Sequence, residues 1–269
     1  TINYYYGGQY FAVFLTKLTG SRVEVTYNLM RTFVAAFAFV FPFSIVRQMM
    51  KDRLYGRMEG RKKYLPSVAG VTAGVAVSIA GNVHYIVYRC VIPMIQKLKG
   101  VEETESYWFP DATRYIGYNP DVPDKTIHEF PCYSFVLGDL HAHVVNVMFV
   151  LFLVGLLYAW MRSVRMREAV IMKPGRKQFW KKQLLIPHIL LAAVMIGMFR
   201  DFIIYFVVTG GVVLFTNIVQ FDGKVKRVLA VTAVQAVEII VISYVVSLPF
   251  TLQFDSMFKG VGIAQNHSM

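Results

Sequence analysis

The sequence is poor in charged residues and in cysteine, and it contains no internal repeat. Charged side chains make up 16% of the 269 residues, whereas an average soluble domain carries about 25%, so an ordinary water-soluble domain is excluded. The two cysteines, Cys90 and Cys132, are too few for a disulfide scaffold or a cysteine-based zinc module. No signal peptide or initiator Met is present, and a tyrosine triplet follows the first three residues. We therefore expect a fragment of a longer protein.

Apolar residues dominate the chain. They account for 56% of it, and the mean hydropathy is +0.48, which is typical of a polytopic membrane protein. Apolar windows of roughly 19 residues mark membrane spans, and they occur at residues 27–50, 65–88, 144–161, 201–220 and 228–250, with a shorter one at 184–198. Residues 8–18 are too few to cross, so we expect a helix in the membrane interface. The predicted fold is an all-α membrane bundle of about six spans, forming one transmembrane domain over residues 1–269.

Basic residues predict the orientation of this bundle. They gather between residues 47 and 63, between 162 and 182, and at 224–227, and the positive-inside rule places all three clusters in the cytoplasm. Residues 1–26, 97–140 and 251–269 then face the outside. The net charge of +12 would also suit a nucleic-acid partner, but in so apolar a chain basic clusters are more typical of cytoplasmic loops. We expect no nucleic-acid partner.

The sharpest polar motif precedes the third long span. Asp139, His141 and His143 alternate along the chain, so an extended backbone would put all three on one face. If a helix has already begun, Asp139 and His143 share a face instead. Either geometry offers ligands to a divalent ion, or a base with its orienting partner. The alternative is an interfacial helix start, with Asp139 beside the N-terminal dipole and the histidines at headgroup level.

Four further polar residues have both a functional and a structural interpretation. Glu129 is a second acid, base or metal ligand, or else a solvated loop carboxylate. Arg114 is a phosphate clamp, or else it forms a salt bridge within its acidic loop. Asp201 belongs to the site, or else it only favours the start of the next helix. Glu238, in mid-membrane, marks a functional site or is a packing residue.

Short blocks along the whole chain resemble one family of membrane proteins. They are Tyr4-Tyr5-Tyr6-Gly7, Thr126-Ile127-His128-Glu129-Phe130-Pro131, Gly138-Asp139-Leu140-His141-Ala142-His143 and Leu248-Pro249-Phe250. Together they are similar to the signature of the YYY family, large prokaryotic membrane proteins named for their tyrosine triplet. The block from Gly138 to His143 is the most specific part of the resemblance.

The resemblance implies a fold and an activity like those of the GT-C membrane glycosyltransferases. Those enzymes take sugars from lipid-phosphate donors on the outer face, and their catalytic carboxylate usually follows the first span. That stretch would precede Thr1, so we expect this chain to lack the first span. Three departures put the site in question, because Arg200 stands where the family has Trp, Ile203 where it has Pro, and Cys132 where it has Phe.

The first functional hypothesis is therefore transfer of a sugar from a polyprenyl-phosphate donor at the outer face. The expected catalytic residues are Asp139, His141, His143 and Glu129, and the expected substrate-binding residues are Tyr4, Tyr5, Tyr6, Arg114 and Asp201. A divalent cation on Asp139, His141 and His143 is part of this hypothesis; its identity stays open, because carboxylates favour Mg²⁺ and histidines favour zinc or another transition metal.

Two other functions remain open. A transporter is one, with Glu238 and the Gly210-Gly211 pair inside predicted spans as its support. A non-catalytic subunit of a larger membrane assembly is the other. Besides membrane lipids, the expected partners are then other membrane subunits or the rest of the same protein.

Overall fold

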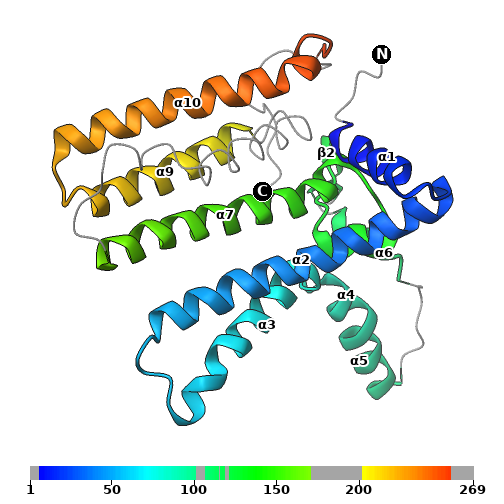
Figure 1. Cartoon of the computed structure of the whole chain (residues 1–269). Helices are drawn as coiled ribbons and strands as arrows, with labels where there is room; N and C mark the ends of the chain where they lie inside the picture. The colour runs from blue at the N-terminus through cyan, green and yellow to red at the C-terminus, as the bar shows by residue number, and fades with distance from the viewer. Residues whose placement is uncertain (1–5, 101–106, 115, 119–120, 171–201, 256–269) are drawn as a thin grey trace.

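Long apolar helices form the framework of the protein. The computed structural model describes residues 6–100, 107–114, 116–118, 121–170 and 202–255, which are mostly helical (Figure 1). Four helices are long and apolar enough to cross a membrane: α2 (Val23–Arg53), α7 (Ala142–Val170), α9 (Phe202–Gln220) and α10 (Val225–Thr251). They confirm the spans predicted at residues 27–50, 144–161, 201–220 and 228–250. The span predicted at 184–198 lies outside the described residues.

The span predicted over residues 65–88 is wrong as a single helix. Helix α3 (Leu65–Ser78) is followed after a break by α4 (His84–Ile86), the π-helical turn η2 (Val87–Val91) and α5 (Ile92–Leu98). Helix α3 ends at Ser78, and the residues just after it contact distant parts of the chain. A β-carbon on Gly81 would lie 2.3 Å from Cε2 of Phe130, and the Asn82 amide donates a hydrogen bond to the carbonyl of Ala112.

Small residues bring α3 against α2. Gly70, Gly74 and Ser78 recur every four residues and are all buried, as in the small-residue interfaces of membrane helices. A β-carbon at Gly70 would lie 2.8 Å from the carbonyl oxygen of Phe43, and one at Gly74 would lie 2.8 Å from the ring of Phe39. Close backbone contact therefore holds the two helices together.

One end of the bundle collects the basic turns. The turn between α2 and α3, which contains the 3₁₀-helix η1 (Gly60–Tyr64), the turn between α9 and α10, and the C-terminal end of α7 lie together at the left of Figure 1. Asp52 ties α2 to α7 there, because its Oδ2 accepts hydrogen bonds from the Tyr158 hydroxyl and from Nε of Arg162, both at 2.8 Å. We call this the basic end. Its cytoplasmic placement stays a prediction.

The opposite end, which we call the motif end, carries the shorter elements. They are α1 (Gly7–Thr19), the 3₁₀-helix η3 (Phe109–Thr113), the antiparallel strands β1 (Ile116–Tyr118) and β2 (Asp121–Thr126), and α6 (Pro131–Leu137). The helix predicted over residues 8–18 is thus confirmed, ending at Gly20 with φ 65°. The two short strands are the exception to the predicted all-α fold.

Two apolar clusters lie along α7. Met30 and Val34 of α2 pack on Val144, Val145 and Met148 near the start of α7. Farther along, Leu153, Leu157 and Trp160 pack on Val213 of α9 and Ile239 of α10. Helix α7 is therefore the shared wall between the α1–α2 side and the α9–α10 side of the bundle.

Candidate functional site

The loop that carries the central motif is a tight connection between two helices. Helix α6 starts with Pro131 at its first position and ends at Gly138, whose φ of 71° is left-handed. The N–H of Asp139 donates to the carbonyl of Ser134 at 2.9 Å, and that of Gly138 donates to Phe135 at 3.2 Å. These two bonds form a Schellman motif. Glycine suits this position because it adopts positive φ without strain.

Helix α7 begins immediately after this loop. The carbonyl of His141 accepts hydrogen bonds from the N–H groups of Val144 and Val145, and Oδ1 of Asp139 accepts one from the N–H of His141 at 3.0 Å. Residues 139–141 therefore precede the helix, which begins at Ala142, so the prediction that Asp139 and His143 share a helix face is wrong. The Asp139 carboxylate satisfies a backbone N–H at the helix start and keeps its second oxygen for other partners.

Two acid–imidazole pairs stand side by side at the motif end. Oδ2 of Asp139 contacts Nδ1 of His141, and Oε2 of Glu129 contacts Nε2 of His143 at 2.8 Å. The two imidazole rings are stacked, with their centroids 5.8 Å apart and their planes 14° from parallel. The carboxylate side chains are 21% and 26% exposed and the histidines 54% and 44%. Each acid is thus partly shielded, while each imidazole reaches solvent.

Glu129 completes a group of metal-ligand types. One carboxylate oxygen from each of Glu129 and Asp139 and one ring nitrogen of His141 all lie within 4.8 Å of one another. Donors on opposite sides of a small divalent ion are roughly 4.2 Å apart, so small side-chain rotations would close this group around an ion. This group differs from the predicted ligand set in one member, with Glu129 in place of His143, whose Nε2 contacts Glu129; the metal site stays a prediction.

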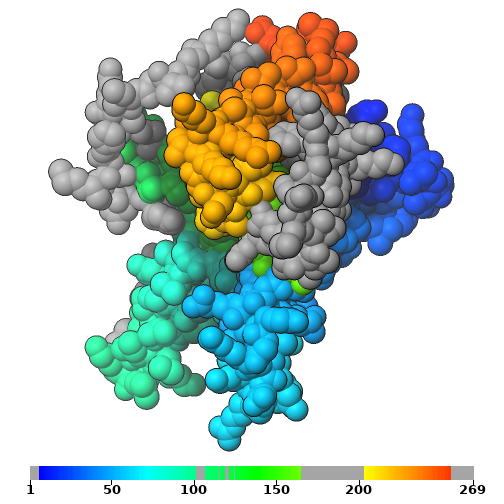
Figure 2. Space-filling view, turned by 60° about the vertical axis from the view of Figure 1, so that its left-hand side comes forward, coloured from blue at the N-terminus to red at the C-terminus, as the bar shows by residue number. Residues whose placement is uncertain are grey.

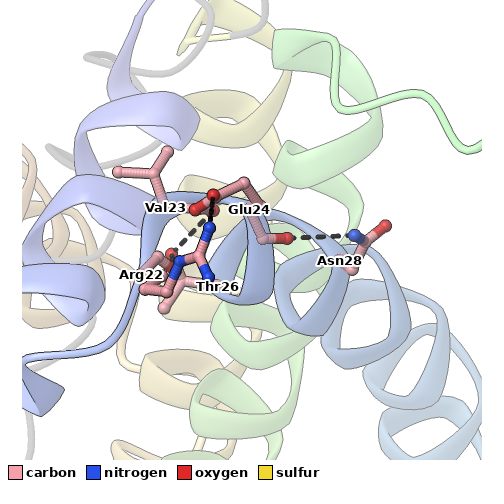
Figure 3. A network of polar contacts seen from close by, with 5 residues as sticks. All are labelled: Arg22, Val23, Glu24, Thr26 and Asn28. Atoms are coloured by element: carbon pink, nitrogen blue, oxygen red, sulfur yellow. Dashed lines mark hydrogen bonds and ion pairs between the residues drawn. The ribbon is translucent and has the colours of Figure 1, made fainter.

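Arg31 brings a positive charge to the same loop. Its Nη2 lies 1.7 Å from where a β-carbon on Gly138 would stand, so the guanidinium rests on the glycine that precedes Asp139. Nη1 of Arg31 donates to Oδ1 of Asn28 at 3.1 Å. Figure 3 shows how the Asn28 amide is held in turn, by donating to the carbonyl of Glu24 at 2.9 Å. The start of α2 thus orients this cation.

The sequence by itself does not connect Arg31 with this loop. The residue lies 107 positions before Gly138 in the chain, and no local pattern connects the two. The local sequence gives one signal of such a contact, a glycine directly before Asp-x-His, because glycine often occurs where another group lies close to the backbone.

Arg114 is close in sequence and space to the Glu129 segment. Its guanidinium carbon lies 4.5 Å from the centre of the Trp108 ring, and its Nη1 is buried without a hydrogen-bond partner among the described residues. The N–H of His128 donates to the carbonyl of Thr113 at 3.1 Å, which joins the end of η3 to the residue before Glu129. The alternative of a loop salt bridge for Arg114 finds no partner in the described part of that loop.

Helix α1 also reaches the motif loop. Nε2 of Gln9 donates to the carbonyl of Leu140 at 3.0 Å, and a β-carbon on Gly8 would lie 2.8 Å from Val145. Tyr6, just before α1, meets the ring of Phe250 edge-on at 5.7 Å. The rest of the tyrosine triplet, Tyr4 and Tyr5, and the predicted Asp201 lie outside the described residues.

Glu238 and the two cysteines lie on helical elements. Glu238 is half-buried in α10, beside the buried face formed by Gln235, Ile239, Ser243 and Ser247. Cys90 and Cys132 are free thiols, the first exposed in η2 and the second partly buried in α6. The candidate site is therefore the loop between α6 and α7 together with Glu129 and Arg31, where two acid–imidazole pairs and a guanidinium meet.

Comparison with known proteins identifies one family match. No curated protein and no solved structure matches the chain. A sequence model described as "Uncharacterized membrane protein (DUF2298)" matches residues 1–269, and the chain therefore belongs to this family of membrane proteins.

Proposed function

We propose that this protein transfers a sugar from a lipid-phosphate donor to an acceptor hydroxyl at the motif end of the bundle. One observation carries the proposal: two carboxylate–imidazole pairs, Asp139–His141 and Glu129–His143, stand beside the guanidinium of Arg31. The resemblance to the YYY family and to GT-C glycosyltransferases supports the same reaction class.

The Asp139–His141 pair is suited to general-base catalysis. An imidazole held by a carboxylate takes a proton from a bound hydroxyl, and the carboxylate stabilises the imidazolium that forms. Asp139 is already oriented by the backbone N–H of His141, and His141 is the most exposed member of the cluster. The acceptor hydroxyl would lose its proton to His141 as its oxygen bonds to the sugar.

Departure of the lipid phosphate needs positive charge nearby. The bond between the sugar carbon and the phosphate oxygen breaks, and the phosphate leaves with the electron pair. Guanidinium groups match phosphate oxygens in a bidentate way. Positive charge placed where the leaving phosphate develops negative charge accelerates the step. Arg31 at Gly138 and Arg114, with its unpartnered Nη1, supply this charge.

A divalent cation is the alternative occupant of the same residues, because an imidazole that binds a metal cannot also take a proton from the acceptor. Glu129, Asp139 and His141 would hold it, and it would supply Lewis-acid stabilisation of the leaving phosphate. Its identity stays open, because the ligand set mixes two carboxylates with one imidazole. His143 would then orient Glu129 as an outer hydrogen-bonding partner.

The test compares matched carboxylate variants of the full chain in lipid nanodiscs. With a polyprenyl-phosphate sugar and its acceptor supplied, Asp139→Asn should lower the transfer rate by about three powers of ten, because the carboxylate that orients His141 and stabilises its imidazolium is lost. The control is Asp121→Asn, which removes an exposed carboxylate paired with Lys125 in the neighbouring hairpin and should leave the rate unchanged.

Two results would contradict the proposal. One is an Asp139→Asn variant that folds and transfers sugar at the parent rate, which would leave this carboxylate only a structural role in the loop. The other is a parent protein that releases no sugar from any polyprenyl-phosphate donor tried, which would favour the non-catalytic subunit or the transporter.

A further inference from the structure

A helical segment at the motif end leaves its apolar side chains uncovered. Elements α4, η2 and α5 follow one another without a break over residues 84–98. Large apolar side chains along this segment are exposed, among them Met94 at 58% and Leu98 at 80%. At 1.5 Å per residue these 15 residues span about 22 Å, which is too short for a hydrocarbon core of about 30 Å.

The segment is amphipathic in a way that suits a membrane surface. Val91, Met94, Ile95 and Leu98 follow the i, i+3, i+4, i+7 spacing of one helix face, and all four are exposed. Lys97 and Lys99 flank that face, and Arg89 lies about two turns before Lys97. Residues 84–100 contain no acidic side chain. Basic groups beside an apolar face match the headgroups and acyl chains of anionic lipids.

Aromatic contacts anchor the start of this segment to the site. Nδ1 of His84 lies 3.1 Å from the Tyr107 hydroxyl. Burial, Asp111 and Tyr85 raise the pKa of Tyr107, so its hydroxyl stays protonated and can donate this bond. Tyr85 packs edge-on against Phe109 with centroids 6.1 Å apart, and Phe109 stacks on Tyr133 of α6 at 5.1 Å.

The far half of the segment stands clear of the bundle. Figure 1 shows α4 and α5 leading away from the motif end, at a steep angle to α7 and α10. Figure 2 shows the same residues, in teal, projecting at the lower left of the molecule. An exposed, basic and apolar helix fixed at one end to a membrane bundle has the bilayer surface as its natural contact.

We propose that residues 84–98 lie in the plane of the membrane and bind anionic lipids in the leaflet at the motif end. The apolar face, defined as Val91, Met94, Ile95 and Leu98, enters the boundary between headgroups and acyl chains. Arg89, Lys97 and Lys99 reach the lipid phosphates. This inference is independent of the proposed transferase activity, because it concerns how the chain meets the bilayer beside the site.

Membrane depth measured residue by residue tests the placement. The full chain with both native cysteines replaced by serine would carry single cysteines at 91, 94, 95, 96, 97 and 98, each spin-labelled in phosphatidylglycerol nanodiscs. Accessibility to oxygen and to a water-soluble nickel complex reports the depth. Positions 91, 94, 95 and 98 should lie at one depth, with 96 and 97 shallower.

Two depth profiles would overturn the proposal. A steady change in depth along the segment, reaching about 10 Å between positions 91 and 98, would mean that it crosses the membrane. Low accessibility of the apolar face to both reagents would mean that a protein partner covers it.

Lipid charge is tested separately. A variant with Arg89→Gln, Lys97→Gln and Lys99→Gln should lose most of the contact between a label at 94 and spin-labelled phosphatidylglycerol. The control variant Lys62→Gln with Lys63→Gln removes charge at the basic end and should leave that contact unchanged. Equal contact in the triple variant and the parent would overturn the anionic-lipid part of the proposal. Neither measurement depends on catalysis, so the transferase proposal can fail while this one stands.

Discussion

Replacing Gly138 with alanine tests the architecture of the site directly. Two costs arise at this position. A non-glycine residue in the left-handed region costs about 1–2 kcal/mol, and the φ of Gly138 is 71°. The new β-carbon would also stand 1.7 Å from Nη2 of Arg31. That atom is the far end of a flexible side chain, so it can move aside, and the added cost is that of its hydrogen bond to Asn28, about 0.5–1.5 kcal/mol. Gly138→Ala should therefore lower the free energy of unfolding by about 1.5–3.5 kcal/mol.

The same substitution at Gly20 is the matched control. Gly20 has a φ of 65°, and no atom outside its chain neighbours lies within 4 Å of the position its β-carbon would take. Gly20→Ala should cost only the backbone part, about 1–2 kcal/mol. The difference between the two variants isolates the contact between Arg31 and Gly138.

A double-mutant cycle in mixed detergent micelles completes the measurement. In an Arg31→Ala background the part of the Gly138→Ala cost that comes from displacing Arg31 should vanish, which gives a coupling of about 0.5–1.5 kcal/mol between the two sites. The free energy of unfolding, followed by circular dichroism, is the readout. Additive effects, or equal costs at Gly138 and Gly20, would refute the placement of Arg31 beside the motif loop.

Three further outcomes are expected. Cobalt(II) added to the full chain should give a visible absorption band that Glu129→Gln abolishes and His143→Gln only weakens; an unchanged band in Glu129→Gln would remove this residue from the ligand set. Gly74→Ala should destabilise the protein by about 1–3 kcal/mol by forcing α3 away from Phe39, measured as unfolding in micelles, and no change would contradict the close helix contact. Asn217→Leu should cost about 0.6–1.7 kcal/mol, because it removes hydrogen bonds to Thr232 and Gln235 of α10 within the apolar bundle; a stabilised variant would show that these bonds contribute nothing.

Local patterns in the sequence were enough to predict the membrane class and most of the framework. Hydropathy over about 20 residues is a local property, so the helices α2, α7, α9 and α10 were found within a few residues of their bounds, except at the C-terminal end of α7, which extends nine residues beyond the predicted span. The short apolar run at residues 8–18 likewise predicted α1. The grouping of the basic turns at one end followed from the same spans, because each helix carries the chain across once.

The break after Ser78 shows where local patterns fail. Residues 65–88 are apolar enough for a span, but contacts of Gly81 and Asn82 with residues 30 or more positions later turn the chain aside. Such contacts have no signature in a hydropathy window, because they depend on which distant segments fold beside the helix end.

The site was likewise predictable in part from local patterns and in part only from the tertiary structure. Alternating Asp139, His141 and His143 marked the motif loop in the sequence, since three polar groups beside a span are costly unless they have partners. The partners themselves came from folding: helix α6 brings Glu129 to His143, and the start of α2 brings Arg31 onto Gly138. A side chain's chemistry belongs to its residue type, whereas its neighbours depend on how the whole chain packs.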